Sequence, residues 1–203
     1  MIKISTIFFD VGGVCLSNGW DNIARKKAAK HFFLNYEEME KRHKSVFKKF
    51  EKGKLPLEDY LNKVVFFGKR NFAKDDFISF MHSQSIEFSS TTKILKKLSA
   101  EKKYQLATIN NESLELNEYR LNKFNLGRYF SCFFSSCYLG TRKPEKEIFY
   151  KALNIMHKEP RSCLFIDDRE ENIQSAQAVG LNTIWLQNHN ELKEKLEEFN
   201  IET

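Results

Sequence analysis

The sequence lacks the features of a membrane-spanning or secreted protein. No apolar run approaches the roughly 20 residues that are needed to cross a bilayer. The first apolar segment leads directly into Asp10 and two glycines, so the N-terminus has no signal-peptide layout. The chain also contains no internal repeat and no low-complexity linker. We therefore expect a cytoplasmic protein with no membrane partner.

Cysteine pairs that would suit a metal or redox site are missing as well. The four cysteines form no CxxC pair, and the five histidines show no ligand spacing with them. Three of the four cysteines lie in or beside apolar runs. This pattern favours small buried thiols in a reducing compartment over metal or redox roles.

The charge of the chain is unbalanced but carries no nucleic-acid signature. The net charge is +6, and basic runs at 25–27, 41–44 and 48–49 fall inside helical patterns. A solvated helix face is the interpretation favoured for these runs, and attraction of an anionic substrate is the second. We expect no nucleic-acid partner, because no aromatic-rich recognition motif accompanies the charge.

The pattern of apolar residues changes twice along the 203 residues of the sequence. A short strand pattern ends at Asp10. Residues 20–85 then show helical periodicity almost throughout. From residue 89 onward, helices and strands alternate, which is typical of a parallel sheet covered on both faces. The sequence predicts an α/β fold, a doubly wound parallel sheet formed by residues 1–16 and 86–203, with a small helical cap (17–85) inserted after the first strand.

The alternating region can be divided into elements. The first helix of this region takes its N-cap from residues 89–92 and continues through Leu98. The later helices are expected at 114–124, 144–157, 171–179 and 191–199, and Pro144 is placed at the first position of its helix. The strands after the first are expected at 104–109, 132–135, 163–166 and 183–186.

Polar residues gather directly after the predicted strands. Ligands bind doubly wound sheets beyond the carboxyl ends of the strands, so residues that follow different strands can meet there. Carboxylates suit Mg²⁺, a lysine offsets phosphate charge, and hydroxyl or backbone N–H groups bind phosphate oxygens. A carboxylate can also accept a phosphoryl group covalently. The residues collected in this way are Asp10, Thr108, Asn110, Asn111, Lys143, Asp167, Asp168 and Asn172.

Four segments in order resemble the conserved segments of haloacid dehalogenase-like (HAD) hydrolases. They are FFDVGGV (8–14), ATINN (107–111), LGTRKPE (139–145) and FIDDREEN (165–172). The first resembles that of bacterial sugar-1-phosphate phosphatases of the glucose-1-phosphatase kind. The third and fourth are also similar to those in the phosphatase portion of bifunctional epoxide hydrolases. The resemblance covers the core, and the helical segment lies where that family inserts its small cap.

The resemblance implies a Mg²⁺-dependent phosphatase that acts on a small phosphorylated metabolite, such as a sugar phosphate, through an aspartyl-phosphate. It implies that Asp10 is the nucleophile and that Thr108, Asn110 and Lys143 hold the phosphoryl group. Asn172 is expected to orient the acidic loop. The implied metal ligands are Asp10, the carbonyl of Gly12, Asp168, and Asp167 directly or through water. We expect the protein to act as a monomer or weak dimer.

The sequence departs from the family at Gly12, where a second aspartate usually serves as general acid and base. Such help contributes roughly 10²–10⁴-fold to the rate, so its absence points to leaving groups that need little protonation or to a cap residue that supplies the help. It also leaves open a non-catalytic binding or scaffold protein on the same fold. A 2-haloacid dehalogenase is the remaining alternative, but the Asp167–Asp168 pair argues against it.

The cap is expected to recognise the leaving group. Its candidate residues are Lys26, Arg42, His43 and Lys44, although helical phase alone does not select among them. Trp20 could stack on a sugar, but packing at the hinge between core and cap is the favoured role.

Overall fold

A computed structural model describes residues 3–203 and contains one five-stranded, all-parallel sheet. The strand order is β3-β2-β1-β4-β5. The predicted doubly wound α/β fold is therefore confirmed. The strands are β1 (Thr6–Phe9), β2 (Gln105–Asn110), β3 (Cys132–Ser135), β4 (Cys163–Asp167) and β5 (Asn182–Trp185).

Helices fill the remaining chain. No helix within 3–203 is both long enough and apolar enough to cross a membrane. Three short 3-10 helices lie at Leu126–Arg128, Pro160–Ser162 and His189–Glu191. The α-helices are α1 (Asn22–His31), α2 (Tyr36–Glu51), α3 (Leu57–Val64), α4 (Lys74–Ser83), α5 (Ser89–Glu101), α6 (Leu114–Lys123), α7 (Ser136–Leu139), α8 (Lys146–Met156), α9 (Glu170–Gln177) and α10 (Leu192–Glu197).

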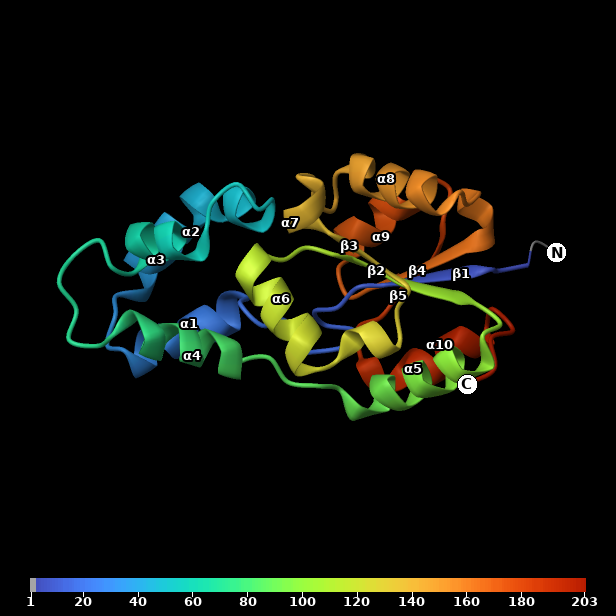
Figure 1. Cartoon of the computed structure of the whole chain (residues 1–203), viewed down its shortest axis with the longest axis horizontal. Helices are drawn as coiled ribbons and strands as arrows, with labels where there is room; N and C mark the ends of the chain where they lie inside the picture. Colours follow the sequence, from blue (N-terminus) through green and yellow to red (C-terminus); the bar gives the residue numbers. More distant parts are fainter. Residues whose placement is uncertain (1–2) are drawn as a thin grey trace.

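Strand alternation divides the core into two layers. Successive side chains of a strand point to opposite faces of the sheet. In β1, Ile7 and Phe9 therefore join the cluster that includes residues of α5 and α10, whereas Phe8 joins the cluster that includes residues of α8 and α9. Figure 1 shows these helix pairs on opposite sides of the sheet. Both faces are covered, which accounts for the nearly continuous apolar sequence of the strands.

Two helix starts differ from the sequence predictions. Helix α8 begins at Lys146, not at Pro144, and the Lys143–Pro144 peptide is cis. The Glu145 carboxylate accepts hydrogen bonds from the Thr141 hydroxyl (2.9 Å) and the Arg142 N–H (3.5 Å), which bends the loop before the helix begins. Helix α5 begins at Ser89 itself with Phe88 as N-cap, so the predicted side-chain cap is wrong.

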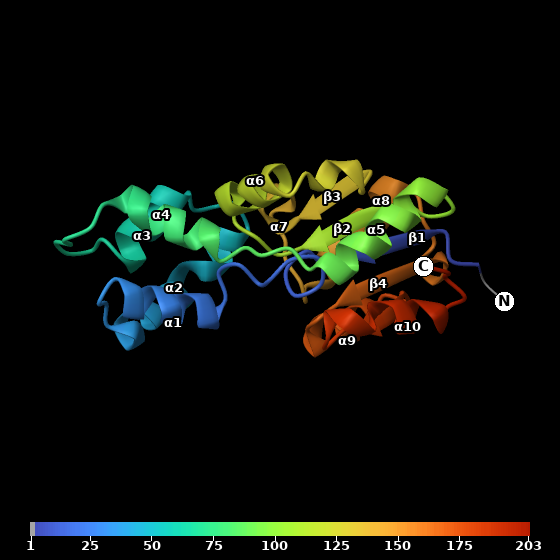
Figure 2. The same ribbon diagram turned by 90° about the horizontal axis from the view of Figure 1, so that it is seen from below.

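Helices α1–α4 form a group beyond the carboxyl ends of the strands (Figures 1 and 2). They enclose a hydrophobic cluster of their own that is rich in aromatic residues. The cluster is centred on fully buried Tyr60 and Phe77. The group therefore stands over the edge of the sheet where Asp10 emerges. The boundaries of a cap domain at 17–85 stay a prediction.

Candidate active site

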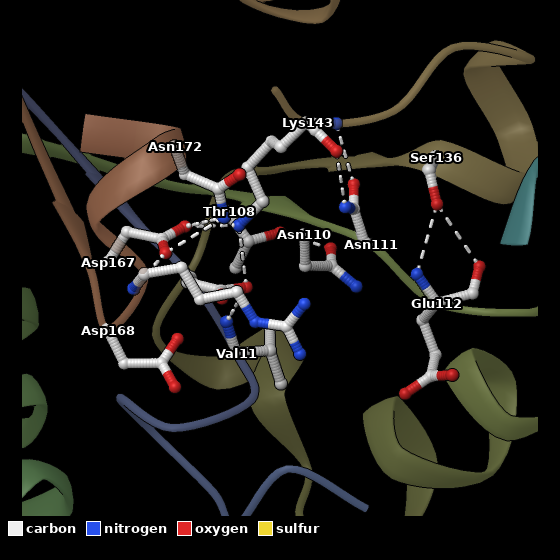
Figure 3. A network of polar contacts seen from close by, with 12 residues as sticks. Val11, Thr108, Asn110, Asn111, Glu112, Ser136, Lys143, Asp167, Asp168 and Asn172 are labelled. Carbon is white, nitrogen blue, oxygen red and sulfur yellow. Dashed lines mark hydrogen bonds and ion pairs between the residues drawn. The ribbon is translucent and has the colours of Figure 1, made fainter. Parts of the chain in front are cut away.

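Asp10 stands where β1 ends at the edge of the sheet that faces α1–α4. Phe9 is in register with Thr108 on β2 and with Ile166 on β4, so Asp10 comes level with Asp167. The Asp10 N–H donates to the Ile166 carbonyl at 2.8 Å, which continues the ladder by one residue. The polar network around this point includes Lys143, Asp167, Asp168 and Asn172 (Figure 3).

A buried lysine joins two of the carboxylates. Lys143 Nζ lies 2.9 Å from Asp10 Oδ1 and 2.6 Å from Asp167 Oδ2, and the Lys143 residue is only 1% exposed. Asp10 Oδ1 also accepts a hydrogen bond from the Val11 N–H at 2.7 Å. No hydrogen bond from residues 3–203 reaches Asp10 Oδ2, and Asp10 lines a cavity. One oxygen of Asp10 is fixed, and the other is available.

Burial and charge shift the protonation of this cluster. Burial raises the pKa of Asp10 to about 7; the Lys143 ammonium opposes this rise, whereas Asp167 and Asp168 add to it. Burial alone would lower the pKa of Lys143, but Asp10 and Asp167 raise it above its ordinary value. Lys143 therefore stays charged, and one further positive charge beside the carboxylates would favour the ionised form of Asp10.

The donor set fits a hard divalent cation. Asp10, Asp167 and Asp168 each offer a ligand atom within 4.8 Å of the others. Asp168 Oδ1 is buried with no hydrogen-bond partner among the described residues, and the turn hydrogen bonds of the loop leave the Gly12 carbonyl unused. Oxygen ligands of this kind suit Mg²⁺.

Asp167 is held more firmly than the other two carboxylates. Its Oδ1 accepts from the Arg169 N–H (2.8 Å) and the Asn172 amide (2.9 Å), and its Oδ2 accepts from Lys143. The Asn172 amide contacts both oxygens of Asp167, which agrees with an orienting role. Asp10, Asp168 and the Gly12 carbonyl are the donors that have free capacity.

The two glycines after Asp10 make room for other side chains. At Gly13, which has φ +79°, a Cβ would lie 2.3 Å from Asp168 Oδ2. At Gly12, a Cβ would lie 3.0 Å from Asn18 Oδ1 and 3.7 Å from an Arg120 guanidinium nitrogen. The space beside Gly12 is thus bordered by an amide and a cation.

A cavity of about 520 Å³ opens over Asp10 between the sheet edge and the helices α1–α4. Its wall on the side of α1–α4 is mostly one face of α2, at helical spacing from Glu40 to Glu51. Three residues that the sequence marked as candidates near the leaving group line this cavity: Trp20, His43 and Lys44. Two other candidates from the sequence do not line it: Lys26 lies over the Tyr36 ring, and Arg42 pairs with Glu38 and covers Phe67.

Trp20 packs in the wall of the cavity. It is 7% exposed, its indole N–H donates to the Tyr60 hydroxyl at 2.8 Å, and its ring meets Phe77 edge to face. These contacts support the predicted packing role at the junction. Trp20 nevertheless contributes to the surface of the cavity.

The residues predicted on β2 do not line the cavity. Thr108 is fully buried, and its hydroxyl donates to the side-chain Oδ1 of Asn110 at 3.4 Å. The Asn110 side chain is engaged with Asn117 (3.0 Å) and Ser135 (2.9 Å). The phosphate-binding roles of Thr108 and Asn110 stay predictions.

Asn111 lines the cavity instead and fixes Lys143. Its amide donates to the Lys143 carbonyl at 2.9 Å, and its Oδ1 accepts from the Lys143 N–H at 2.8 Å. This paired contact sets the backbone from which the lysine side chain extends. The sequence placed Asn111 at a strand end, but gave it no role because the partner is a backbone 32 residues away.

Ion pairs in the wall were also missed, and two of them join separate segments of the chain. Arg120 pairs with Glu112 at 2.8 Å and donates to the Ser17 carbonyl, which joins α6 to the loop after Asp10. Arg142 pairs with Glu51 at 2.6 Å, which joins the Lys143 loop to the end of α2. The partners are 8 and 91 residues apart in sequence, so no local pattern marks them.

Comparisons with known proteins identify the family of the chain. The family model for haloacid dehalogenase-like hydrolases matches residues 4–180. An Arabidopsis thaliana protein named flavin mononucleotide hydrolase 1 is 28% identical over 163 residues, which cover 80% of this chain and 65% of that protein. A phosphoglycolate phosphatase of Aquifex aeolicus is 29% identical over 82 residues, which cover 40% of this chain and 38% of its own length.

A solved structure shows the same fold. A HAD family enzyme from Bacteroides thetaiotaomicron, in complex with magnesium and inorganic phosphate, has a TM-score of 0.76 at 23% identity. The match covers 89% of this chain and 93% of that one. The chain belongs to the haloacid dehalogenase-like hydrolase family, as its sequence segments predicted. It spans less than two thirds of the length of the two named relatives.

Proposed function

We propose that this protein is a Mg²⁺-dependent phosphatase that hydrolyses small phosphate monoesters through an aspartyl-phosphate on Asp10. The observation that carries the proposal is the asymmetry of Asp10. Lys143 and the Val11 N–H hold Oδ1, while Oδ2 is free beside a cavity of about 520 Å³. A carboxylate fixed through one oxygen and open at the other is suited to nucleophilic attack.

In the first step, Asp10 Oδ2 forms a bond to phosphorus as the bond from phosphorus to the leaving oxygen breaks. In the second step, water attacks the phosphorus, which releases inorganic phosphate and restores the Asp10 carboxylate. Lys143 neutralises charge on the transferring group and keeps Asp10 oriented. When bound by Asp10, Asp168 and the Gly12 carbonyl, Mg²⁺ would supply additional positive charge to the phosphate oxygens.

The residues around Gly12 limit the leaving group. Asn18 and Arg120 border the space where a second aspartate would stand, and Arg120 is itself paired with Glu112. No carboxylic acid is placed two residues after Asp10 to protonate the departing oxygen. We therefore expect faster turnover of aryl and other activated phosphates than of simple alkyl phosphates.

The relatives support a phosphatase. Two of them carry names of enzymes that act on phosphate monoesters, flavin mononucleotide and phosphoglycolate. The Bacteroides thetaiotaomicron enzyme was solved with both magnesium and inorganic phosphate. These substrates differ greatly in size, so the names support the reaction and do not select the substrate. A sugar phosphate stays a prediction from the sequence.

Hydrolysis of p-nitrophenyl phosphate by the full-length protein tests the proposal. We expect turnover that requires Mg²⁺ and that is lost in Asp10→Asn. Asp75→Asn is the matched control, because Asp75 is an exposed carboxylate of α4 outside the cavity. If a broad panel of phosphate monoesters gives no hydrolysis, the protein is a non-catalytic member of its family. Halide release from a 2-haloacid without metal would identify a dehalogenase instead.

A further inference from the structure

Most of the cations that line the cavity already have a carboxylate partner. Six arginines and lysines line it. Four of them lie within 4.0 Å of a carboxylate oxygen: Arg25 with Glu40, Arg120 with Glu112, Arg142 with Glu51, and Lys143 with Asp10 and Asp167. Among residues 3–203, Lys44 and Arg169 have no such partner. Lys44 and Arg169 are therefore the two lining cations that a ligand can engage without breaking an ion pair of the described residues.

The two unpaired cations come from different parts of the fold. Lys44 belongs to the face of α2 that forms one wall. Arg169 belongs to the loop between β4 and α9, and its backbone N–H binds Asp167. Both cations line the cavity that Asp10 also lines.

Between the ion-paired Glu40 and Glu51, the same face of α2 presents neutral rings to the cavity. The Trp20 indole can only donate, and it donates to the Tyr60 hydroxyl at 2.8 Å. The Tyr60 hydrogen is then available to His43 Nδ1, 2.8 Å away, which leaves the imidazole proton on Nε2. Phe47 stacks on His43 with ring centroids 5.4 Å apart. His43 and Phe47 thus offer the ligand a neutral donor and an apolar ring.

From this distribution we propose that Lys44 and Arg169 form a subsite for a second anionic group on the substrate, a carboxylate or a second phosphate. The inference rests on the proposed phosphatase activity and specifies its substrate class. The reacting phosphate already has Lys143, so the unpaired pair is available to the remainder of the molecule. Charge-assisted hydrogen bonds to such a group strengthen binding and fix its orientation.

Three esters with one two-carbon skeleton test the subsite. Hydroxyethyl phosphate has a neutral end, phosphoglycolate has a carboxylate, and ethylene glycol bisphosphate has a second phosphate. We expect kcat/KM for at least one of the two esters that carry a second anionic group to exceed that for hydroxyethyl phosphate by about tenfold or more, chiefly through KM. Comparing these two esters shows which anionic group is preferred.

Single substitutions then assign the preference to residues. In Lys44→Gln and Arg169→Gln we expect the ratio of kcat/KM between the preferred ester with a second anionic group and hydroxyethyl phosphate to fall toward one. Lys49→Gln is the control, since Lys49 is an exposed lysine of α2 that does not line the cavity. We expect it to keep the ratio of the unsubstituted protein.

The outcomes separate the subsite from the phosphatase activity. Equal kcat/KM for all three esters, alongside hydrolysis of p-nitrophenyl phosphate, overturns the subsite alone. Loss by the same factor for all three esters in Lys44→Gln and Arg169→Gln also overturns it, because the two cations then act on the reacting phosphate. If the folded protein cleaves no ester in Mg²⁺, including p-nitrophenyl phosphate, the proposed function fails and the subsite with it.

Discussion

Replacing Gly13 by alanine should disturb the proposed metal site through a single methyl group. Gly13 has φ +79°, and the new Cβ would lie 2.3 Å from Asp168 Oδ2 and 2.4 Å from its Cγ. Real Cβ atoms do not approach other atoms so closely, so the Asp168 carboxylate must move. Asp168 carries the one buried carboxylate oxygen of the acidic cluster that has no partner among residues 3–203.

Two other glycines separate the effects that Gly13→Ala combines. Gly140 also has positive φ, +67°, but a Cβ there meets nothing within 4 Å, so Gly140→Ala adds backbone strain of about 1–2 kcal/mol and no clash. Gly127→Ala adds neither, and its unfolding free energy should change by less than about 1 kcal/mol. Gly13→Ala should cost at least as much as Gly140→Ala, because the clash adds to the strain.

Urea unfolding and Mg²⁺ activation together measure this prediction. The Mg²⁺ concentration for half-maximal hydrolysis of p-nitrophenyl phosphate should rise about tenfold or more in Gly13→Ala, because a displaced ligand weakens the site. It should stay unchanged in Gly140→Ala and Gly127→Ala. If Gly13→Ala shows the stability loss of Gly140→Ala and an unchanged Mg²⁺ requirement, the assignment of Asp168 as a metal ligand is wrong.

Three further predictions follow from the polar network. Asn111→Ala removes both hydrogen bonds to the Lys143 backbone, so kcat/KM should fall about 10²-fold with little change in melting temperature. The pKa of His43 is lowered to about 3 by burial and Arg25, below its ordinary 6.5, so the unfolded chain takes up the proton first as pH falls. Neutral His43 makes its full contribution to the free energy of unfolding above pH 6.5, and about 2 kcal/mol of that contribution should be lost by pH 5. Urea unfolding of His43→Gln at the same pH values should not show this loss. Arg120→Met leaves Glu112 buried without its partner and should cost about 3–5 kcal/mol, most of which the double variant with Glu112→Leu should recover.

The sequence was sufficient for the fold and for the reactive edge. Strand alternation is encoded locally, and β3 was predicted at its observed bounds. Asp10, Lys143 and Asp168 could be collected because parallel strands bring their carboxyl ends to one edge. The rule places residues at that edge, but it does not say which of their atoms remain free. Only the structure shows that Asp167 accepts hydrogen bonds from neighbouring groups whereas Asp168 Oδ1 has no partner among the described residues.

The parts that escaped prediction depend on contacts between distant segments. Asn111 meets the backbone of Lys143, and Glu51 at the end of α2 meets Arg142. Helical phase puts Arg42 and Lys44 on nearly opposite faces of α2, about 200° apart, but it does not say which face meets the cavity. The choice depends on how α2 packs over the sheet edge, which is set by its contacts with α7 and α3.

The most direct test of the account asks whether Asp10 carries phosphate during turnover. Rapid acid quench of the full-length protein with labelled substrate and Mg²⁺ should yield a hydroxylamine-labile phosphoryl group on the peptide that contains Asp10. The label should appear before free phosphate reaches its steady rate, and Asp10→Asn should show neither label nor turnover. Continued turnover in Asp10→Asn, or labelling of another residue, would contradict the account.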